Sequence, residues 1–200
     1  MNRSYIVMTG YAAGKAAARL AADNRETLKK YYSISYIDRM IRSGEPDLTD
    51  ENTTDVSVEF LMTCPGIKRK IERGDPRGAE DCENTSVPAV YPAAGGGIYR
   101  GLWNICEDFR CGIRVDIRDI PIKQETVEIC NHFDTDPYTS DDESVYLMVA
   151  SKLHPLIDHL AAHGIYAAPV GYLTEERARM IVIGDNVRYL NRPKIQEENT

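Results

Sequence analysis

Three consecutive glycines, Gly95, Gly96 and Gly97, form the stretch of this sequence that points most directly to a chemical role. They follow a short apolar run and precede an amphipathic helical pattern, within the stretch from Val87 to Phe109. A strand, loop and helix in this order presents backbone N–H groups to an anion. The glycines are therefore predicted to contact a phosphate or another ligand. The alternative, left open by the sequence, is steric: the helix must start close to the strand.

The same loop lacks the side chains that catalysis requires. From Tyr91 to Gly97 it contains no Asp, Glu, Ser, Thr, Lys or His, so it offers neither a metal ligand nor a group that moves a proton. A second loop, GYAAGKA around Lys15, resembles a phosphate-binding P-loop only in part. Three residues separate its glycines instead of four, and Ala16 occupies the Ser/Thr position that binds Mg²⁺. We expect a close strand-to-helix crossover there.

Two other groups of side chains have the chemistry of metal ligands. His154, His159 and His163 lie in one helical stretch, and the last two have i, i+4 spacing, but no Glu completes an HExxH pattern. The acidic run lacks the spacing of an EF-hand, and such a run is usually a solvated face; its members are Asp134, Asp136, Asp141, Asp142 and Glu143. The sequence therefore predicts no metal site and no catalytic residue.

Composition excludes several classes of function. The 200 residues are 42% apolar and 28% charged, typical of a soluble globular chain, and their net charge of −7 disfavours binding to a nucleic acid backbone. No uninterrupted apolar run approaches the roughly 18 residues that span a bilayer. The five cysteines are odd in number and lack CxxC spacing, which favours reduced thiols. We expect a cytoplasmic protein with no membrane partner, in which Cys106 and Cys130 are small core residues.

Apolar periodicity predicts alternating strands and helices. The first half contains a strand at Ser4–Thr9, a helix from Ala12 to about Tyr32, and a helix at Ser35–Arg42 whose apolar face is Ile34, Ile37, Met40 and Ile41. The second half contains a helix at Ile98–Phe109 capped by Gly112, a strand at Gly112–Ile117, a helix within Lys123–Phe133, a strand at Val145–Ala150, a helix capped by Ser151, and strands at Ile165–Leu173 and Met180–Ile183. Between the halves, Val56–Met62 fits a strand or a helix. Five or six strands with four or five helices indicate an α/β sandwich, with helices packed on a mixed sheet.

From Gly95 to Tyr138 the motifs follow an order that resembles a known domain. They are Gly96-Gly97, Leu102-Trp103, Val115-Asp116-Ile117, Ile120-Pro121-Ile122, Gln124 to Cys130, and Asp136-Pro137-Tyr138. This order is similar to the C-terminal domain of the aminoimidazole ribonucleotide (AIR) synthase-related superfamily, most closely its AIR synthase-like and hydrogenase-maturation-like members. The resemblance covers about Ser86 to Leu190 and the opening strand and loop. It implies one domain over residues 1–190, with a weakly matching insertion at about 45–85 and a frayed tail at 191–200.

The resemblance also implies what this chain lacks. Family members normally carry an N-terminal domain that dimerises and holds most of the ATP and Mg²⁺ ligands, and we expect this chain to start directly in the C-terminal domain. Aligned on Gly96-Gly97, Pro92 occupies the position of a family acid and Ala94 that of a family Thr. Ser144 stands where a small residue, usually Gly, precedes the apolar strand. Loss of these polar groups is expected to remove catalytic chemistry, whereas the glycines can still perform their role in the backbone.

The leading hypothesis is therefore a stand-alone C-terminal-type domain that acts as a non-catalytic, accessory ligand-binding subunit. One alternative is half of a split ATP-dependent synthetase or dehydratase, with ATP and Mg²⁺ bound only when a separate ATP-binding-domain protein completes it. A second alternative is a structural homo-oligomer. We expect no enzyme activity from the chain alone.

Overall fold

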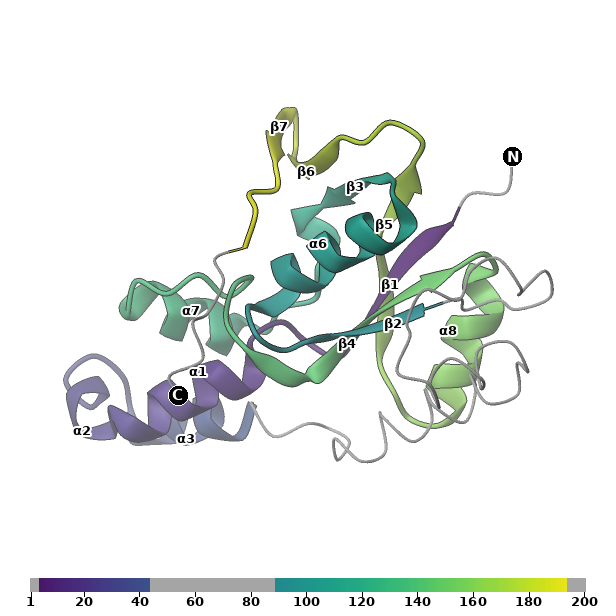
Figure 1. The fold of residues 1–200 in the computed structure, drawn as a ribbon. Helices are drawn as coiled ribbons and strands as arrows, with labels where there is room; N and C mark the ends of the chain where they lie inside the picture. Colours follow the sequence, from purple (N-terminus) through teal and green to yellow (C-terminus); the bar gives the residue numbers. More distant parts are fainter. Residues whose placement is uncertain (1–3, 44–88, 194–200) are drawn as a thin grey trace, which may run out of the picture.

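Seven strands form one mixed sheet, in the order β2-β4-β1-β5-β3-β6-β7 (Figure 1). The computed structural model describes residues 4–43 and 89–193. Its strands are β1 (Tyr5–Thr9), β2 (Ala89–Ala93), β3 (Gly112–Asp116), β4 (Asp142–Ala150), β5 (Ala167–Thr174), β6 (Arg179–Ile183) and β7 (Asn186–Tyr189). Among these described strands, β3 and β6 pair in parallel and the other five neighbouring pairs are antiparallel. The predicted α/β class and mixed sheet are confirmed.

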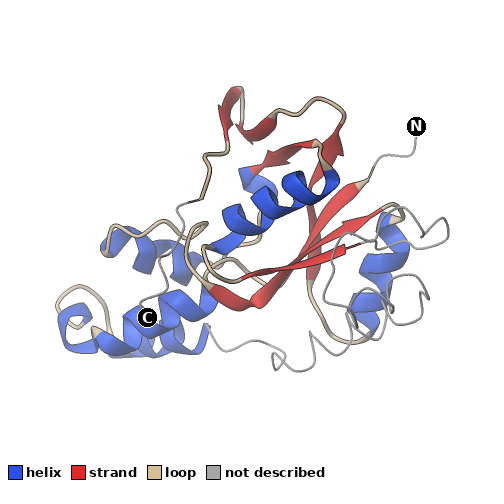
Figure 2. Ribbon diagram, viewed as in Figure 1, coloured by secondary structure: helices blue, strands red, loops and turns tan. Residues whose placement is uncertain are grey.

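Helices cover both faces of the sheet and one end of it (Figure 2). They are α1 (Gly14–Asp23), α2 (Arg25–Leu28), α3 (Ile34–Ser43), α6 (Gly97–Phe109), α7 (Gln124–His132) and α8 (Leu153–Ala162), with a 3₁₀ turn η2 at Ile117–Asp119. Alternating residues of the central strands point to opposite faces. Ile6 and Leu147 pack with α6 in the main core, whereas Val7 and Met148 pack with α8.

A separate helical cluster lies beyond one end of the sheet (Figure 1). Buried residues of α1, α3 and α7 meet there, among them Ala21, Ile37 and Ile129. Cys130 belongs to this cluster and Cys106 to the main core, so both cysteines are core residues as predicted. Ile34 was placed on the apolar face of α3, but its side chain is 57% exposed, because the first residue of α3 lies outside the helical cluster.

Several predicted boundaries are wrong. The helix expected over residues 12–32 breaks at Asn24, whose side-chain amide donates to the carbonyl of Leu20, and a separate short helix α2 follows. The residue that ends α6 in the left-handed conformation is Arg110, not Gly112. Glycine is needed at position 112 for another reason: the backbone of Glu176 passes so close that a Cβ would lie 1.9 Å from its carbonyl oxygen. Ser151 does not cap α8: Lys152 holds the N-cap position, with no side-chain cap bond.

Strand β7 was not predicted. It pairs with β6 through a two-residue turn, in which Ile183 and Asn186 are partners and Gly184 has a positive φ of 59°. All four residues of β7 are exposed, so its short alternation of polar and apolar residues, Asn-Val-Arg-Tyr, does not correspond to a buried face. The Gly184-Asp185 pair, a known hairpin signal, was the available clue. Residues 56–62, Cys64 and Cys82 lie outside the described residues.

Asp142 belongs to the acidic run, but the sequence did not predict that its carboxylate would be buried and hydrogen-bonded. Its side chain is 2% exposed. One carboxylate oxygen accepts a hydrogen bond from the backbone N–H of Lys15, at 3.1 Å, and the other accepts from the N–H and hydroxyl of Ser144. Because helix α1 has no side-chain cap of its own, this carboxylate from β4 takes over that role.

Replacing Asp142 with Ala is therefore expected to lower the free energy of unfolding by about 2–3 kcal/mol, because it removes the acceptor of partly buried donors of Lys15 and Ser144. Urea unfolding, followed by circular dichroism, measures the change. Glu143→Ala is the control: this neighbouring carboxylate is exposed, so its loss should change the free energy of unfolding by less than about 0.5 kcal/mol. Equal effects of the two substitutions would contradict the capping role.

Candidate functional site

The glycine loop joins β2 to α6 through three residues with positive φ. The values are 67° at Gly95, 132° at Gly96 and 69° at Gly97. At Gly97 a Cβ would lie 2.6 Å from the carbonyl oxygen of Tyr138, whereas at Gly95 it would meet nothing within 4 Å. The steric alternative therefore holds for Gly97, although its close neighbour is the loop before β4 and not the strand β2.

One backbone N–H of this loop is already hydrogen-bonded to a carboxylate of the same chain. The N–H of Gly96 donates to Oδ1 of Asp141 at 2.6 Å. Gly96 is the N-cap residue of α6, which has no side-chain cap of its own, and a negative charge at a helix N-terminus is stabilising. The backbone donor that the sequence predicted for a ligand thus faces an internal anion at this position.

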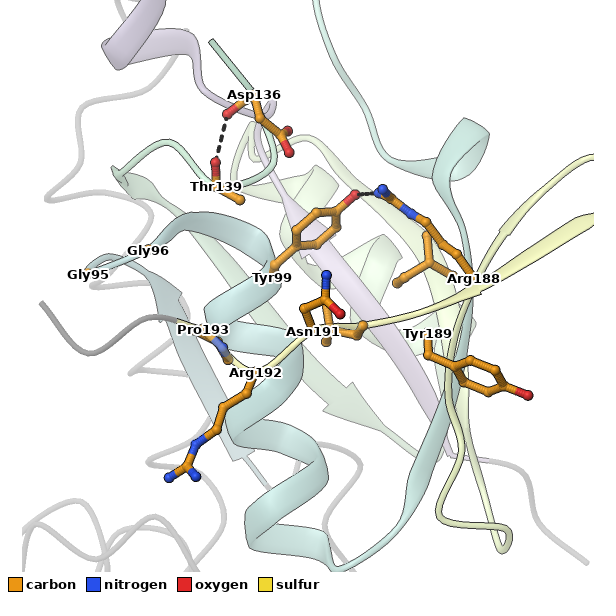
Figure 3. A pocket seen from close by; sticks show the side chains of 12 residues that line it. Gly95, Gly96, Tyr99, Asp136, Thr139, Arg188, Tyr189, Asn191, Arg192 and Pro193 are labelled. Atoms are coloured by element: carbon orange, nitrogen blue, oxygen red, sulfur yellow. Dashed lines mark hydrogen bonds between the residues drawn. The ribbon is translucent and has the colours of Figure 1, made fainter.

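A cavity of about 640 Å³ lies beside the loop (Figure 3). Gly95 and Gly96 form one wall, Tyr99 projects from α6, and Asp136 and Thr139 come from the loop before β4. The remaining wall is Ile181 of β6 and the segment from Arg188 to Pro193. The cavity thus joins the predicted glycine loop to a C-terminal segment, part of which, residues 191–193, was expected to be a frayed tail.

Tyr99 is held in place from two sides. Its ring stacks on Tyr138 with centroids 5.6 Å apart, and the guanidinium of Arg188 donates a hydrogen bond to its hydroxyl oxygen (Figure 3). Burial raises the pKa of Tyr99 to about 12, with Arg188 acting in the opposite direction. Tyr99 is therefore a neutral phenol at physiological pH.

The cavity carries more positive than negative side chains. Arg188 and Arg192 line it together with one carboxylate, Asp136. Asp136 is engaged locally, since its Oδ1 accepts from the N–H of Tyr138 at 2.9 Å and its carbonyl oxygen accepts from the hydroxyl of Thr139. In a chain of net charge −7, this local excess favours an anionic ligand.

The other candidate residues lie elsewhere. The rings of His159 and His163 are 4.7 Å apart, but α8 covers the sheet face opposite α6 and these rings do not line the cavity. Within residues 4–43 and 89–193, no group of three or more His, Cys, Asp or Glu side chains is placed to hold a metal ion. Pro92 and Ala94 do not line the cavity either.

The cavity residues that were missed from the sequence include Tyr99, Arg188 and Arg192. Tyr99 belongs to the helical pattern after the glycines, and only its position two residues after Gly97 was a signal. The two arginines come from β7 and the residues after it, where no motif marked them.

The sequence matches no family model, and no curated protein matches it. Solved structures with the same fold are nevertheless found. HypE in a HypE–HypF complex has a TM-score of 0.63 at 14% identity, over 96% of this chain and 54% of that one. HypE in complex with ATP has a TM-score of 0.61 at 13% identity, over 96% of this chain and 51% of that one. T. maritima PurL complexed with FGAR has a TM-score of 0.51 at 13% identity, over 92% of this chain and 26% of that one.

These structures confirm the AIR synthase-related fold that the sequence resemblance implied. The chain spans about half the length of the HypE chains that it matches. None of the helices in the described part of the chain is long and apolar enough to cross a membrane.

Substitution can separate two reasons for glycine in this loop: the positive φ, which Gly95 and Gly97 share, and the close approach of Tyr138, which affects Gly97. Gly95→Ala adds a methyl group in open space and should lower the free energy of unfolding by about 1–2 kcal/mol, the usual cost of the left-handed conformation. Gly97→Ala adds a backbone overlap to that strain, and should cost about 1–3 kcal/mol more. Thermal or urea unfolding compares the two variants. An equal loss of stability would contradict the close approach at Gly97.

Proposed function

We propose that this domain binds an anionic, phosphate-bearing small molecule in the cavity beside the glycine loop, and that it acts as an accessory ligand-binding subunit. The observation that carries the proposal is the pair of arginines, Arg188 and Arg192, that line the cavity together with Gly95 and Gly96. Arginine is suited to phosphate because its planar guanidinium donates two parallel hydrogen bonds.

The arrangement supports binding more than catalysis. Asp136 is the carboxylate of the cavity wall, and its Oδ1 is already held by a backbone N–H. Tyr99 is a neutral phenol whose oxygen accepts from Arg188, so it is poorly placed to take up a proton. Gly95, Gly96 and Gly97 contribute shape and backbone groups only.

The solved structures with this fold support a phosphate-bearing ligand. One is HypE in complex with ATP, and another is AaThiL complexed with AMPPCP and TMP, which has 10% identity to this chain. At such identities the likeness is one of fold, so the ligand class enters here as part of the proposal.

A second candidate function is half of a split ATP-dependent enzyme, completed in trans by an ATP-binding-domain protein. It is supported by HypE in complex with ATP, a solved structure that shares this fold. A third, a homo-oligomer, is favoured by exposed apolar side chains of the β6–β7 hairpin, Ile183, Val187 and Tyr189.

A cytoplasmic location is part of the proposal and is supported by the free thiols of Cys106, Cys111 and Cys130.

Arg188→Gln tests the binding proposal. Isothermal titration with ATP, and separately with pyrophosphate, should show at least about a tenfold weaker affinity for the variant, because a charge-assisted hydrogen bond is worth about 1.5–3 kcal/mol. Arg177→Gln is the matched control: it removes the same charge from an exposed turn outside the cavity and should bind as the unaltered chain does. Binding of neither probe, or equal loss in both variants, would contradict the proposal.

Hydrolysis distinguishes the accessory subunit from a complete enzyme. The purified chain with ATP and Mg²⁺ should release no phosphate above the buffer rate, because the carboxylate of the described cavity wall, Asp136, already accepts a backbone hydrogen bond from Tyr138. The malachite green assay measures this. Release that Arg188→Gln abolishes would overturn the accessory role and leave the binding site in place.

A further inference from the structure

The C-terminal end of α6 brings two cysteines together. Arg110 has the left-handed φ of 51° and its N–H donates to the carbonyl of Glu107 at 3.3 Å. The N–H of Cys111 donates to the carbonyl of Cys106, also at 3.3 Å. These two bonds define a Schellman motif, which is frequently accompanied by a side-chain contact between the two residues that the longer bond joins, here Cys106 and Cys111. Here both side chains are thiols.

The backbone geometry is compatible with a covalent link. A donor-to-acceptor distance of 3.3 Å between Cys111 and Cys106, added to standard bond lengths, limits their Cα–Cα distance to about 7 Å. Disulfides usually span about 4.4–6.8 Å between Cα atoms. No large movement of the chain is therefore needed to join the two sulfurs.

The two thiols differ in their access to solvent. Cys106 is 1% exposed, whereas Cys111 is half-buried, and both are free. Burial raises the pKa of Cys106 to about 12, the Cys111 thiol adds to this effect, and Arg179 acts against it. Burial also raises the pKa of Cys111. The resting state is therefore a protonated dithiol, in which Cys111 carries the more accessible sulfur.

We propose that Cys106 and Cys111 are a reversible oxidation site, converted into an intrachain disulfide by a two-electron oxidant. With diamide as the oxidant, the sulfur of Cys111 adds to the N=N bond, forming an S–N bond, and the other nitrogen takes a proton. The sulfur of Cys106 then loses its proton and attacks the sulfur of Cys111. The S–S bond forms, the S–N bond breaks, and its nitrogen takes the second proton, so that diamide is reduced to a hydrazine.

The surroundings supply a spectroscopic reporter. Trp103, the single tryptophan of the chain, lies one helical turn before Cys106, and the guanidinium of Arg179 lies 3.6 Å from the centre of its ring. The same guanidinium pairs with Glu107. A change in the covalent state of Cys106 therefore alters the environment of Trp103. This inference does not depend on the proposed ligand.

The experiment oxidises the native full-length chain with diamide, blocks remaining thiols with iodoacetamide, and digests with trypsin without reduction. Arg110 lies between the two cysteines, so trypsin separates GLWNICEDFR (101–110) from CGIR (111–114). The disulfide is expected to hold these two peptides together, at a mass two hydrogens below their sum. Dithiothreitol should separate them.

Cys111→Ser and Cys130→Ser are the matched variants. Cys130 is buried in the helical cluster of α1, α3 and α7, so its substitution should leave the linked peptide and the diamide-induced change in Trp103 fluorescence intact. Cys111→Ser should abolish both, and far-ultraviolet circular dichroism checks that it is folded. The proposal is overturned if native Cys106 and Cys111 are both recovered alkylated after diamide, or if either is linked instead to Cys64, Cys82, Cys130 or a second chain.

Discussion

The fold depends on two adjacent carboxylates at the start of β4. In the sheet order β2-β4-β1, β4 is antiparallel to both neighbours, so its first residues lie beside the ends of β1 and β2. Those strand ends lead into α1 and α6, and neither helix has a side-chain cap of its own. Asp142 accepts from the N–H of Lys15 at the start of α1, and Asp141 accepts from Gly96 at the start of α6. One dipeptide thus stabilises both helix starts.

This constraint changes how the glycine loop is understood. A strand, glycine loop and helix normally leave backbone donors for an external anion. Here Asp141 occupies the Gly96 donor, and Gly97 is required because Tyr138 passes within 2.6 Å of the position of a Cβ. The positive charge of the neighbouring cavity therefore comes from Arg188 and Arg192, on a segment remote in sequence from the loop. The glycines shape one wall of the cavity, and the arginines supply its positive side chains.

The sequence predicts what local patterns control. The helical spacing after Gly97, the apolar run before Ala150 and the burial of Cys106 all follow from periodicity, and the structure confirms them. The resemblance in motif order predicted the fold, which the solved structures confirm. The proposed ligand contact at Gly95, Gly96 and Gly97 stays a prediction.

The features that the sequence did not predict depend on long-range contacts. Asp142 is 127 positions from its partner Lys15, so a buried cap looked like part of a solvated acidic run. Arg110 takes a conformation that favours glycine, and Gly112, two residues later, drew the prediction because its close contact with Glu176 was not visible. The cavity arginines belong to the exposed strand β7 and the residues after it, where no periodicity marks a function.

The central claim is that anions bind in the arginine-lined cavity and leave the Gly96–Asp141 bond intact. An NMR titration of the ¹⁵N-labelled chain with ATP tests it most directly. The account predicts chemical-shift changes at the backbone amides of Tyr99 and Asn191 and at the side chain of Arg188, with the Gly96 amide retaining the shift of a hydrogen-bonded donor. Changes centred on Gly14 and Lys15, or none at Arg188, would contradict it.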